Sequence, residues 1–300
     1  MLGFRGSLPF VSAASLVVVF AVSVRLGASD ISSYQTSVEK WRQNYEADLK
    51  SDNGWLTVAG LFWLHEGENR FGSDHGNDIV LPFASVPAVA GHFDLHAGKT
   101  VVHVNPGVPI MMGGKPVESA ELRPDSKQDR MVLGDLTIFV HASGNRFAIR
   151  VKDKNSKLRK EFKGLNWYPI NPAYHVTARY SSYPAPRDVE IETVLGDREK
   201  LSLAGYVTFL LDGKEYRLEA EKNDDDGLFI IFRDLTSRTE TYQAARFLDT
   251  DPPSNGSVEL DFNKAYNPPC AYNPYTTCPL PSPGNRLPLK ITAGEKRYHP

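Results

Sequence analysis

The arginines of this chain suggest chemistry with anions. Arg150, Arg159 and Arg246 stand in polar, aromatic-rich stretches, and His175 and Tyr242 belong to stretches of the same kind. A guanidinium gives planar two-point recognition of a carboxylate or a phosphate. A histidine beside such arginines can act as general acid or base when its pKa lies near the working pH. These five residues predict a site for a small anionic ligand, with His175 as the candidate catalytic residue and no nucleophile identified.

The same arginines also fit a structural role. Arg150 stands three residues before Asp153, and Arg246 can pair with Asp234. Ion pairs of this kind brace neighbouring strands, and each pair taken alone favours that interpretation. The ligand site is inferred because several such polar and aromatic stretches occur together.

The segment 262–285, FNKAYNPPCAYNPYTTCPLPSPGN, is too rich in proline for a regular helix or a central strand. Asn263, Asn267 and Asn285 carry amides that both donate and accept hydrogen bonds, so they could bind a neutral or anionic ligand. Alternatively, they cap turns of their own loop. The segment is therefore either the wall of a site or a clasp over the protein body.

Both cysteines of the chain, Cys270 and Cys278, lie in this segment. In an exported protein two such cysteines are expected to form a disulfide. The bridge would close a nine-residue loop and stabilise the fold by roughly 2.6 kcal/mol in the chain-entropy model. Two thiolates alone do not complete a tetrahedral zinc site. A catalytic cysteine is the alternative.

Standard catalytic and cofactor motifs are absent from the sequence. It has no Gly-x-Ser-x-Gly, no His-Glu-x-x-His and no phosphate-binding glycine loop with lysine. His92 and His96 lie in a predicted strand, where four residues span about 13 Å, so this pair alone does not predict a metal site. The acidic run NDDDG at 223–227 lacks the ligand spacing of a calcium loop. The sequence predicts no cofactor and no metal.

Residues 1–28 have the layout of an export signal. Arg5 is followed by the apolar run LPFVSAASLVVVFAVSV, then by Arg25 and small residues. The run is also at the lower length limit for a membrane span, so an uncleaved anchor is the alternative. Without Arg5 and Arg25 the chain has 34 − 2 = 32 basic and 36 acidic residues, a net charge of −4. We expect a periplasmic or secreted protein, attached to a membrane only if the signal is uncleaved, and no nucleic-acid partner.

The remaining chain predicts one helix followed by strands. Residues 29–54 carry apolar side chains at three- and four-residue steps, which indicates an amphipathic helix. Residues 55–151 and 152–300 are rich in short branched and aromatic runs separated by turns, which indicates two antiparallel β units. The clearest hairpin turn is Asp212-Gly213. The predicted fold is mainly β, with the helix packed on the first unit.

Residues 55–151 resemble a forkhead-associated (FHA) β-sandwich. The resemblance rests on the stretches GENRFGSDHGNDIVLP, VHVNPGVPI and LRPDSKQDRMVLGDLTIFV. FHA domains read phosphothreonine with an arginine and a Ser-x-x-His motif. Here Ser85 is present, but Ala88 stands in the place of the histidine and no arginine follows Ser85. The resemblance therefore implies the fold and argues against phosphopeptide binding.

The exported part as a whole resembles a bacterial and archaeal family known as domain of unknown function 1684. The matching stretches are NGWLTVAGLFWLHEGENRFGSD, IRVKDKNSKLRKEFKGLNWYPI, RDLTSRTETYQAARFL and FNKAYNPPCAY…TCPLPSPGN. We expect a protein that binds, and by extension hydrolyses, a small anionic ligand. Two alternatives remain: a noncatalytic interaction module that uses the FHA-like face, and a structural protein of the cell envelope.

Overall fold

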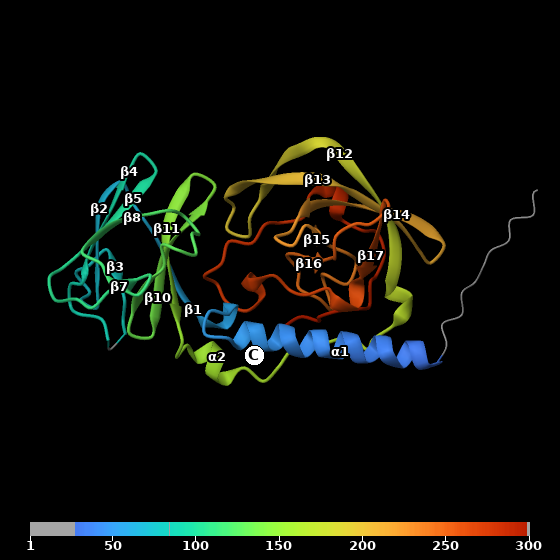
Figure 1. Cartoon of the computed structure of the whole chain (residues 1–300), viewed down its shortest axis with the longest axis horizontal. Coiled ribbons are helices and arrows are strands. Elements are labelled where there is room, and N and C mark those ends of the chain that lie inside the picture. The colour runs from blue at the N-terminus through green and yellow to red at the C-terminus, as the bar shows by residue number, and fades with distance from the viewer. Residues whose placement is uncertain (1–27, 84, 299–300) are drawn as a thin grey trace, which may run out of the picture.

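Two β units lie next to each other, and one long helix runs along the second unit (Figure 1). The computed structural model describes residues 28–83 and 85–298. The predicted signal lies outside the described residues except for Ala28, where helix α1 (Ala28–Lys50) begins. Within the described ranges, no helix is both long and apolar enough to cross a membrane. The mainly β fold with an N-terminal helix, predicted from the sequence, is confirmed.

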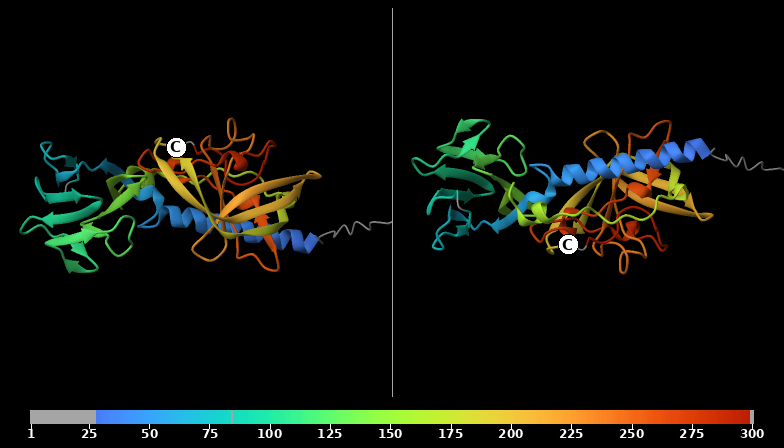
Figure 2. Two further views of the ribbon diagram at one scale, coloured as in Figure 1. Left: turned by 90° about the horizontal axis from the view of Figure 1, so that it is seen from above. Right: turned by 90° about the horizontal axis from the view of Figure 1, so that it is seen from below.

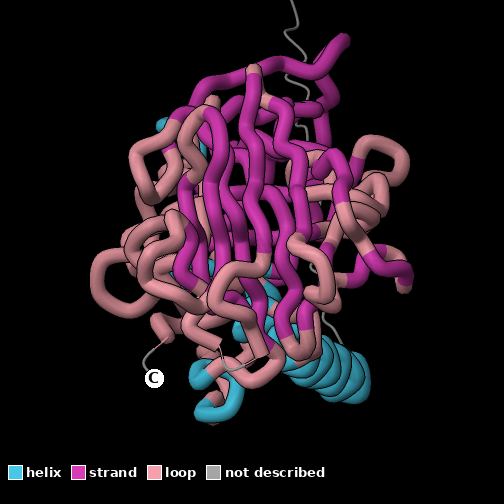
Figure 3. Tube along the Cα trace, turned by 90° about the vertical axis from the view of Figure 1, so that its left-hand side faces the viewer, coloured by secondary structure: helices cyan, strands magenta, loops and turns pink. Residues whose placement is uncertain are grey.

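The first unit is a sandwich of a six-stranded sheet, in the order β1-β11-β10-β9-β6-β7, and a five-stranded sheet, in the order β3-β2-β4-β5-β8. Figure 3 shows strands of this unit running beside one another. Phe71 and Phe93 of the five-stranded sheet share one core with Ile138 and Ile149 of the six-stranded sheet. The strands are β1 (Val58–Trp63), β2 (Gly67–Gly72), β3 (Ile79–Val80), β4 (Gly91–His96), β5 (Lys99–Val104), β6 (Met111–Met112), β7 (Lys115–Pro116), β8 (Ser119–Leu122), β9 (Met131–Leu133), β10 (Leu136–Ser143) and β11 (Arg146–Asp153).

The second unit is one six-stranded antiparallel sheet in the order β16-β15-β14-β13-β12-β17. The hairpin between β13 and β14 turns at Asp212 and Gly213, whose φ angles of 50° and 72° are those that the sequence predicted for this pair. The strands are β12 (His175–Glu192), β13 (Arg198–Leu211), β14 (Lys214–Lys222), β15 (Leu228–Phe232), β16 (Arg246–Asp249) and β17 (Ser257–Asp261). Helix α2 (Lys157–Glu161) and the 3-10 helices η1 (Trp55–Thr57) and η2 (Pro172–Tyr174) connect the elements.

Helix α1 packs on the second unit and not on the sandwich, which corrects the expectation from the sequence. The Trp41 ring lies edge-on to Trp167, with ring centroids 6.0 Å apart, and 6.4 Å from the Tyr266 ring. Arg42 donates a hydrogen bond to the main-chain carbonyl of Asn263 at 3.1 Å. Figure 2 shows the helix lying along this unit in both views. The aromatic face of the helix finds its aromatic partners in the second unit, and this decides where it packs.

The proline-rich segment 262–285 follows an irregular path over the second unit. Its short helices are η3 (Phe262–Lys264), η4 (Pro269–Ala271) and η5 (Pro283–Asn285). Tyr266 pairs with Phe247 of β16 through two main-chain hydrogen bonds of 2.9 and 3.0 Å. Further along, Thr277 leaves the second unit far enough to bond a histidine of the sandwich. The segment is therefore a clasp over the sheet and also reaches the other unit.

Candidate functional site

A buried polar face lies where the second unit covers the six-stranded sheet of the sandwich. Side chains along β10 and β11 alternate between the two faces of the sheet. Ile138 and Ile149 point into the sandwich core, while His141 and Arg150 lie on the opposite face. Thr277 of segment 262–285 hydrogen-bonds to this face. Polar groups of the two units therefore meet away from the apolar core.

His141 links a carboxylate and a hydroxyl in one line. Its Nδ1 lies 2.9 Å from Oδ1 of Asp125, and its Nε2 lies 2.7 Å from Oγ1 of Thr277. With the proton on Nδ1, the imidazole donates to Asp125 and accepts from the Thr277 hydroxyl. The His141 side chain is 10% exposed and that of Asp125 is 49% exposed, so solvent reaches one end of the line. The arrangement has the order of a nucleophile–base–acid triad.

The charge of Asp125 suits the orienting role in such a triad. Burial raises the pKa of this carboxyl, but the hydrogen bond and the charge of His141 outweigh burial and lower the pKa below its ordinary value. Asp125 is therefore ionised at neutral pH. An ionised carboxylate at Nδ1 holds the imidazole in the tautomer whose Nε2 can accept the Thr277 proton.

Arg150 lies on the same face with an unsatisfied guanidinium. The residue is 4% exposed, and its Nε and Nη2 are buried with no hydrogen-bond partner among the described residues. Burial lowers the pKa of Arg150, and the charges of Asp125 and Cys278 oppose this effect, so both groups are close to the guanidinium. A buried donor without a partner is costly. Two N–H groups of Arg150 are thus left without a partner on this face.

Two further cations surround Arg150. Burial, followed by the charges of Arg130 and Arg150, lowers the pKa of Lys152 to about 8. The Lys152 ammonium lies 5.3 Å from the Trp55 ring centroid, and the Arg130 guanidinium lies 5.1 Å from that of Phe139. Within the described chain, none of the three cations has a carboxylate within 4.0 Å. We call Arg130, Arg150 and Lys152 the cation cluster.

The two cysteines lie beside this cluster as free thiols. The Cys270 amide donates to Sγ of Cys278 at 3.3 Å, and Tyr242 donates its hydroxyl proton to the Cys270 carbonyl at 3.0 Å. A hydrogen bond from the Cys270 thiol lowers the pKa of Cys278, with a smaller contribution from the Arg150 charge. The structure shows adjacent thiols and not a bridge, so the disulfide stays a prediction.

Arg246 does not belong to this site. Its side chain is completely buried, with Nη1 2.7 Å from Oδ2 of Asp234 and 3.0 Å from the carbonyl of Ile291. Nη2 donates to the carbonyl of Ala293. The sequence left the structural ion pair with Asp234 open as an alternative, and the structure shows this pair. The ligand-binding role expected for Arg246 is wrong, because no face of its guanidinium is accessible.

The three asparagines of segment 262–285 are buried and hold the segment in place. Asn263 donates to the Asn171 carbonyl at 2.8 Å, and Asn285 donates to the Ile231 carbonyl at 2.8 Å. Asn267 donates to Oε1 of Glu295 at 2.7 Å. Their amides serve internal hydrogen bonds, which corrects the expectation that they bind a ligand.

The other predicted site residues lie apart from Arg150. Arg159 bonds to Asp52 at 2.7 Å, next to the end of α1. His175 stacks on Tyr34 with 5.0 Å between ring centroids, and its Nε2 lies 3.4 Å from Oε2 of Glu259. The groove that His175 lines, of about 1030 Å³, contains seven carboxylates and two lysines and would repel an anion: Asp48, Asp224, Asp225, Asp249, Asp251, Glu259 and Asp261, with Lys222 and Lys264. The predicted single pocket of Arg150, Arg159, His175, Arg246 and segment 262–285 is therefore not formed.

Three residues of the observed site were missed in the sequence. Asp125 and His141 are 16 positions apart, and Thr277 follows 136 positions after the histidine. One local signal was available, because His141 directly follows the run LTIFV and is the one ionisable side chain of β10. A polar residue in such a strand indicates that the outer face of the strand is covered by polar groups.

The chain belongs to an uncharacterised protein family. Residues 160–296 match the model of the family described as Protein of unknown function (DUF1684). An uncharacterized protein of Haloarcula marismortui, solved in solution by NMR, is 34% identical, with 46% of this chain and 78% of that chain covered and a TM-score of 0.39. No curated protein is significantly similar to this chain.

Two further solved structures are also similar to parts of this chain. One, from a study of phosphothreonine-dependent FHA domain interactions, is 18% identical, with 31% of this chain and 92% of that chain covered and a TM-score of 0.23. The other, Mycobacterium tuberculosis EmbR in complex with a low-affinity phosphopeptide, is 16% identical, with 43% of this chain and 33% of that chain covered and a TM-score of 0.23.

Proposed function

We propose that the protein binds a small anionic ligand, a carboxylate or a phosphate, at the cation cluster and hydrolyses an ester bond of that ligand at Thr277. The observation that carries the proposal is the Asp125–His141–Thr277 line beside the unpaired guanidinium of Arg150. With the export predicted for residues 1–28, the reaction would take place in the periplasm or outside the cell.

The cation cluster would bind the charged group of the substrate. A carboxylate or phosphate can accept two parallel hydrogen bonds from the free edge of Arg150. Lys152 adds a charge that depends on pH, since its pKa is about 8. Affinity for the anion should therefore fall as the pH rises through 8. The tryptophan and phenylalanine rings beside the cluster hold its cations through cation–π contacts.

The triad would carry out the bond cleavage. Oγ1 of Thr277 attacks the ester carbonyl carbon while its proton passes to Nε2 of His141, and the Asp125 carboxylate stabilises the imidazolium. His141 then gives this proton to the leaving alcohol, which departs as the acyl–threonine forms. A water molecule gives a proton to Nε2 of His141 as its oxygen attacks the acyl carbon. His141 then returns this proton to Oγ1 of Thr277 as the bond between the acyl carbon and Oγ1 breaks, which releases the acid and restores the hydroxyl.

The test is turnover of 4-nitrophenyl esters by the purified protein. One series carries a free carboxylate or phosphate, such as the succinate monoester, and the control series is neutral. We expect the anionic esters to be preferred, and we expect Thr277→Val and His141→Gln to lower kcat at least about 100-fold, the usual scale for general acid–base catalysis. Arg150→Met should raise KM for the anionic esters and leave the neutral ones unchanged.

The chain offers matched controls for each substitution. His175→Gln and Thr177→Val remove the same chemical groups from the second unit, outside the site, and should leave turnover unchanged. If the His175 variant loses turnover and the His141 variant keeps it, the triad is not the catalytic site. If no ester is cleaved and inorganic phosphate or succinate does not raise the Tm of the protein, the proposal is refuted in both its parts.

A further inference from the structure

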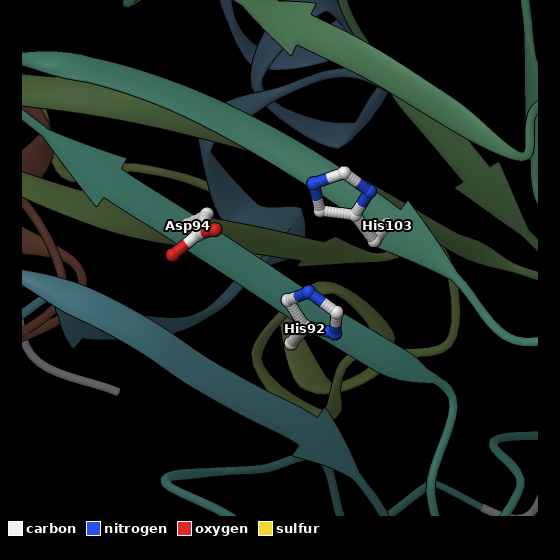
Figure 4. Close-up of side chains that lie close together, drawn as sticks. All are labelled: His92, Asp94 and His103. Carbon is white, nitrogen blue, oxygen red and sulfur yellow. The ribbon is translucent and has the colours of Figure 1, made fainter.

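A second cluster of ligating side chains lies on the five-stranded sheet of the sandwich, which does not carry the triad. His92 of β4 stands directly opposite His103 of β5 in the antiparallel register. Asp94 follows His92 by two residues and therefore lies on the same face of β4. Figure 4 shows the three side chains close together on this face. Among the described residues, this is the one group of three such side chains whose ligand atoms all lie within 4.8 Å of one another.

The two imidazoles are stacked rather than paired with carboxylates. Their ring centroids are 4.8 Å apart and the ring planes are inclined by 27°. In a tetrahedral zinc site with bonds of about 2.1 Å, the ligand atoms lie roughly 3.4 Å apart. The two strands already hold the three Cα positions close together. Small rotations of the side chains can therefore bring ligand atoms that lie up to 4.8 Å apart to a separation of roughly 3.4 Å. All three residues are half-buried, so an ion can reach them from solvent.

We propose that His92, His103 and Asp94 bind a divalent transition-metal ion of the Zn²⁺ type. Two imidazoles and one carboxylate are ligands that suit zinc, and three protein ligands leave a position for water. The oxygen-preferring ions Mg²⁺ and Ca²⁺ do not fit, because nitrogen provides two of the three ligands. This site was not predicted from the sequence. The spacing of His92 and His96 along one strand was considered there, whereas the partner of His92 is His103 on the next strand.

Neighbouring side chains support the geometry. Oγ of Ser119 lies 3.2 Å from Nδ1 of His103, so this nitrogen is occupied and Nε2 is the one available to a metal. Metal-bound histidines typically use their second nitrogen for a hydrogen bond of this kind. The Asp94 carboxylate also lies 3.4 Å from Nε2 of His96, which competes with the ion for Oδ1.

The charges on the adjacent strand β2 do not exclude a cation. Arg70 stands opposite His92, but its guanidinium donates to the carbonyl of Gly76 at 3.2 Å. Glu68 stands opposite Asp94 and adds a negative charge. Glu68 therefore offsets the charge of Arg70 beside the three ligands.

The test is a calorimetric titration of the tag-free, metal-free full-length protein with Zn²⁺ alone. We expect one ion per chain, and we expect His92→Gln, His103→Gln and Asp94→Asn each to weaken binding at least 10-fold. His75→Gln, which changes an exposed histidine in a turn of the same unit, is the matched control and should bind as the wild type does. Co²⁺ should give the visible absorption of a low-coordinate site in the wild type and lose it in the three variants.

One measurement needs no variant. In the NMR spectrum of the wild type, Zn²⁺ should shift the imidazole signals of His92 and His103 and leave that of His175 in place. Wild-type binding no tighter than that of the His103 variant would overturn the proposal. So would zinc-dependent shifts that are as large at His175 as at His92. Ester turnover does not enter either readout, so the outcome is separate from that of the proposed function.

Discussion

Replacing Arg246 by methionine should destabilise the second unit severely. The guanidinium is fully buried and donates to three acceptors: the Asp234 carboxylate at 2.7 Å, the Ile291 carbonyl at 3.0 Å and the Ala293 carbonyl. Methionine fills much of the volume but donates nothing. The substitution therefore leaves a buried carboxylate and two buried carbonyls without these donors.

The magnitude follows from these contacts. Breaking a buried ion pair by removing one partner costs about 3–5 kcal/mol. Each orphaned buried carbonyl adds about 1–3 kcal/mol unless water reaches it. Since folded proteins are stable by about 5–15 kcal/mol in total, the loss approaches the whole stability of a typical domain. The double substitution Arg246→Met with Asp234→Leu removes both charges and should recover part of the loss, leaving the cost of the two carbonyls.

The assay is urea unfolding monitored by far-ultraviolet circular dichroism, with the matched control Arg198→Met. Arg198 makes an ion pair of 3.2 Å with Glu190, and the two side chains are 71% and 67% exposed. An exposed pair of this kind contributes about 0–1 kcal/mol, so the control should lose little. Equal losses for the two variants would refute the reasoning that burial, and not the ion pair itself, makes Arg246 essential. A double variant less stable than Arg246→Met alone would refute the assignment of Asp234 as its partner.

Two further predictions concern the C-terminal residues. Burial raises the pKa of Glu295 from 4.5 to about 8. Between these two pH values the folded chain keeps a proton that the unfolded chain has lost. The contribution of Glu295 to the free energy of unfolding should therefore fall as the pH rises and level off above 8. Urea unfolding at several pH values should therefore show that the free energy of unfolding of Glu295→Gln rises relative to that of the wild type, by up to roughly 5 kcal/mol between pH 4.5 and 8. Parallel profiles for the two proteins would mean that the donors around the carboxylate keep it ionised. Gly294 has a φ of 79°, and a Cβ there would lie 2.4 Å from the carbonyl oxygen of Ala265, so Gly294→Ala should lower the Tm by several degrees. Gly256→Ala, at a φ of 75° with open space around it, isolates the backbone strain and should lower the Tm less; equal shifts would contradict the clash.

Local chemistry explains why much of the fold could be predicted. Asp212 and Gly213 tolerate positive φ angles, so the turn between β13 and β14 was predictable from two residues. Short branched and aromatic runs separated by turns likewise indicated strands, and β10 and β11 pair as a hairpin. The surface on which α1 packs could not be predicted, because an aromatic stripe shows that a helix packs but not against which partner.

The candidate site was harder to predict because burial and register decide it. Arg150 and Arg246 are equivalent in the sequence, yet Arg150 has two unpaired nitrogens and no carboxylate partner, whereas Arg246 leaves only Nε unpaired and has its carboxylate partner Asp234. His141 was passed over, since nothing in its neighbourhood names Thr277 as its partner. A shift of one residue along segment 262–285 would move the Thr277 hydroxyl away from His141.

The contacts of α1 make the second unit discontinuous along the chain. This unit consists of the helix at residues 28–50 and the strands that begin at His175, while the whole sandwich lies between them in the sequence. The first and last strands of the sandwich are neighbours, with Val58 opposite Lys152, so the chain leaves the second unit and returns to it at almost the same place. The sandwich is thus an insertion whose first and last strands lie side by side. A short linker between the chain ends on either side of the sandwich would join the two parts of the second unit. Gain or loss of the insertion would therefore leave intact the unit that carries the family match.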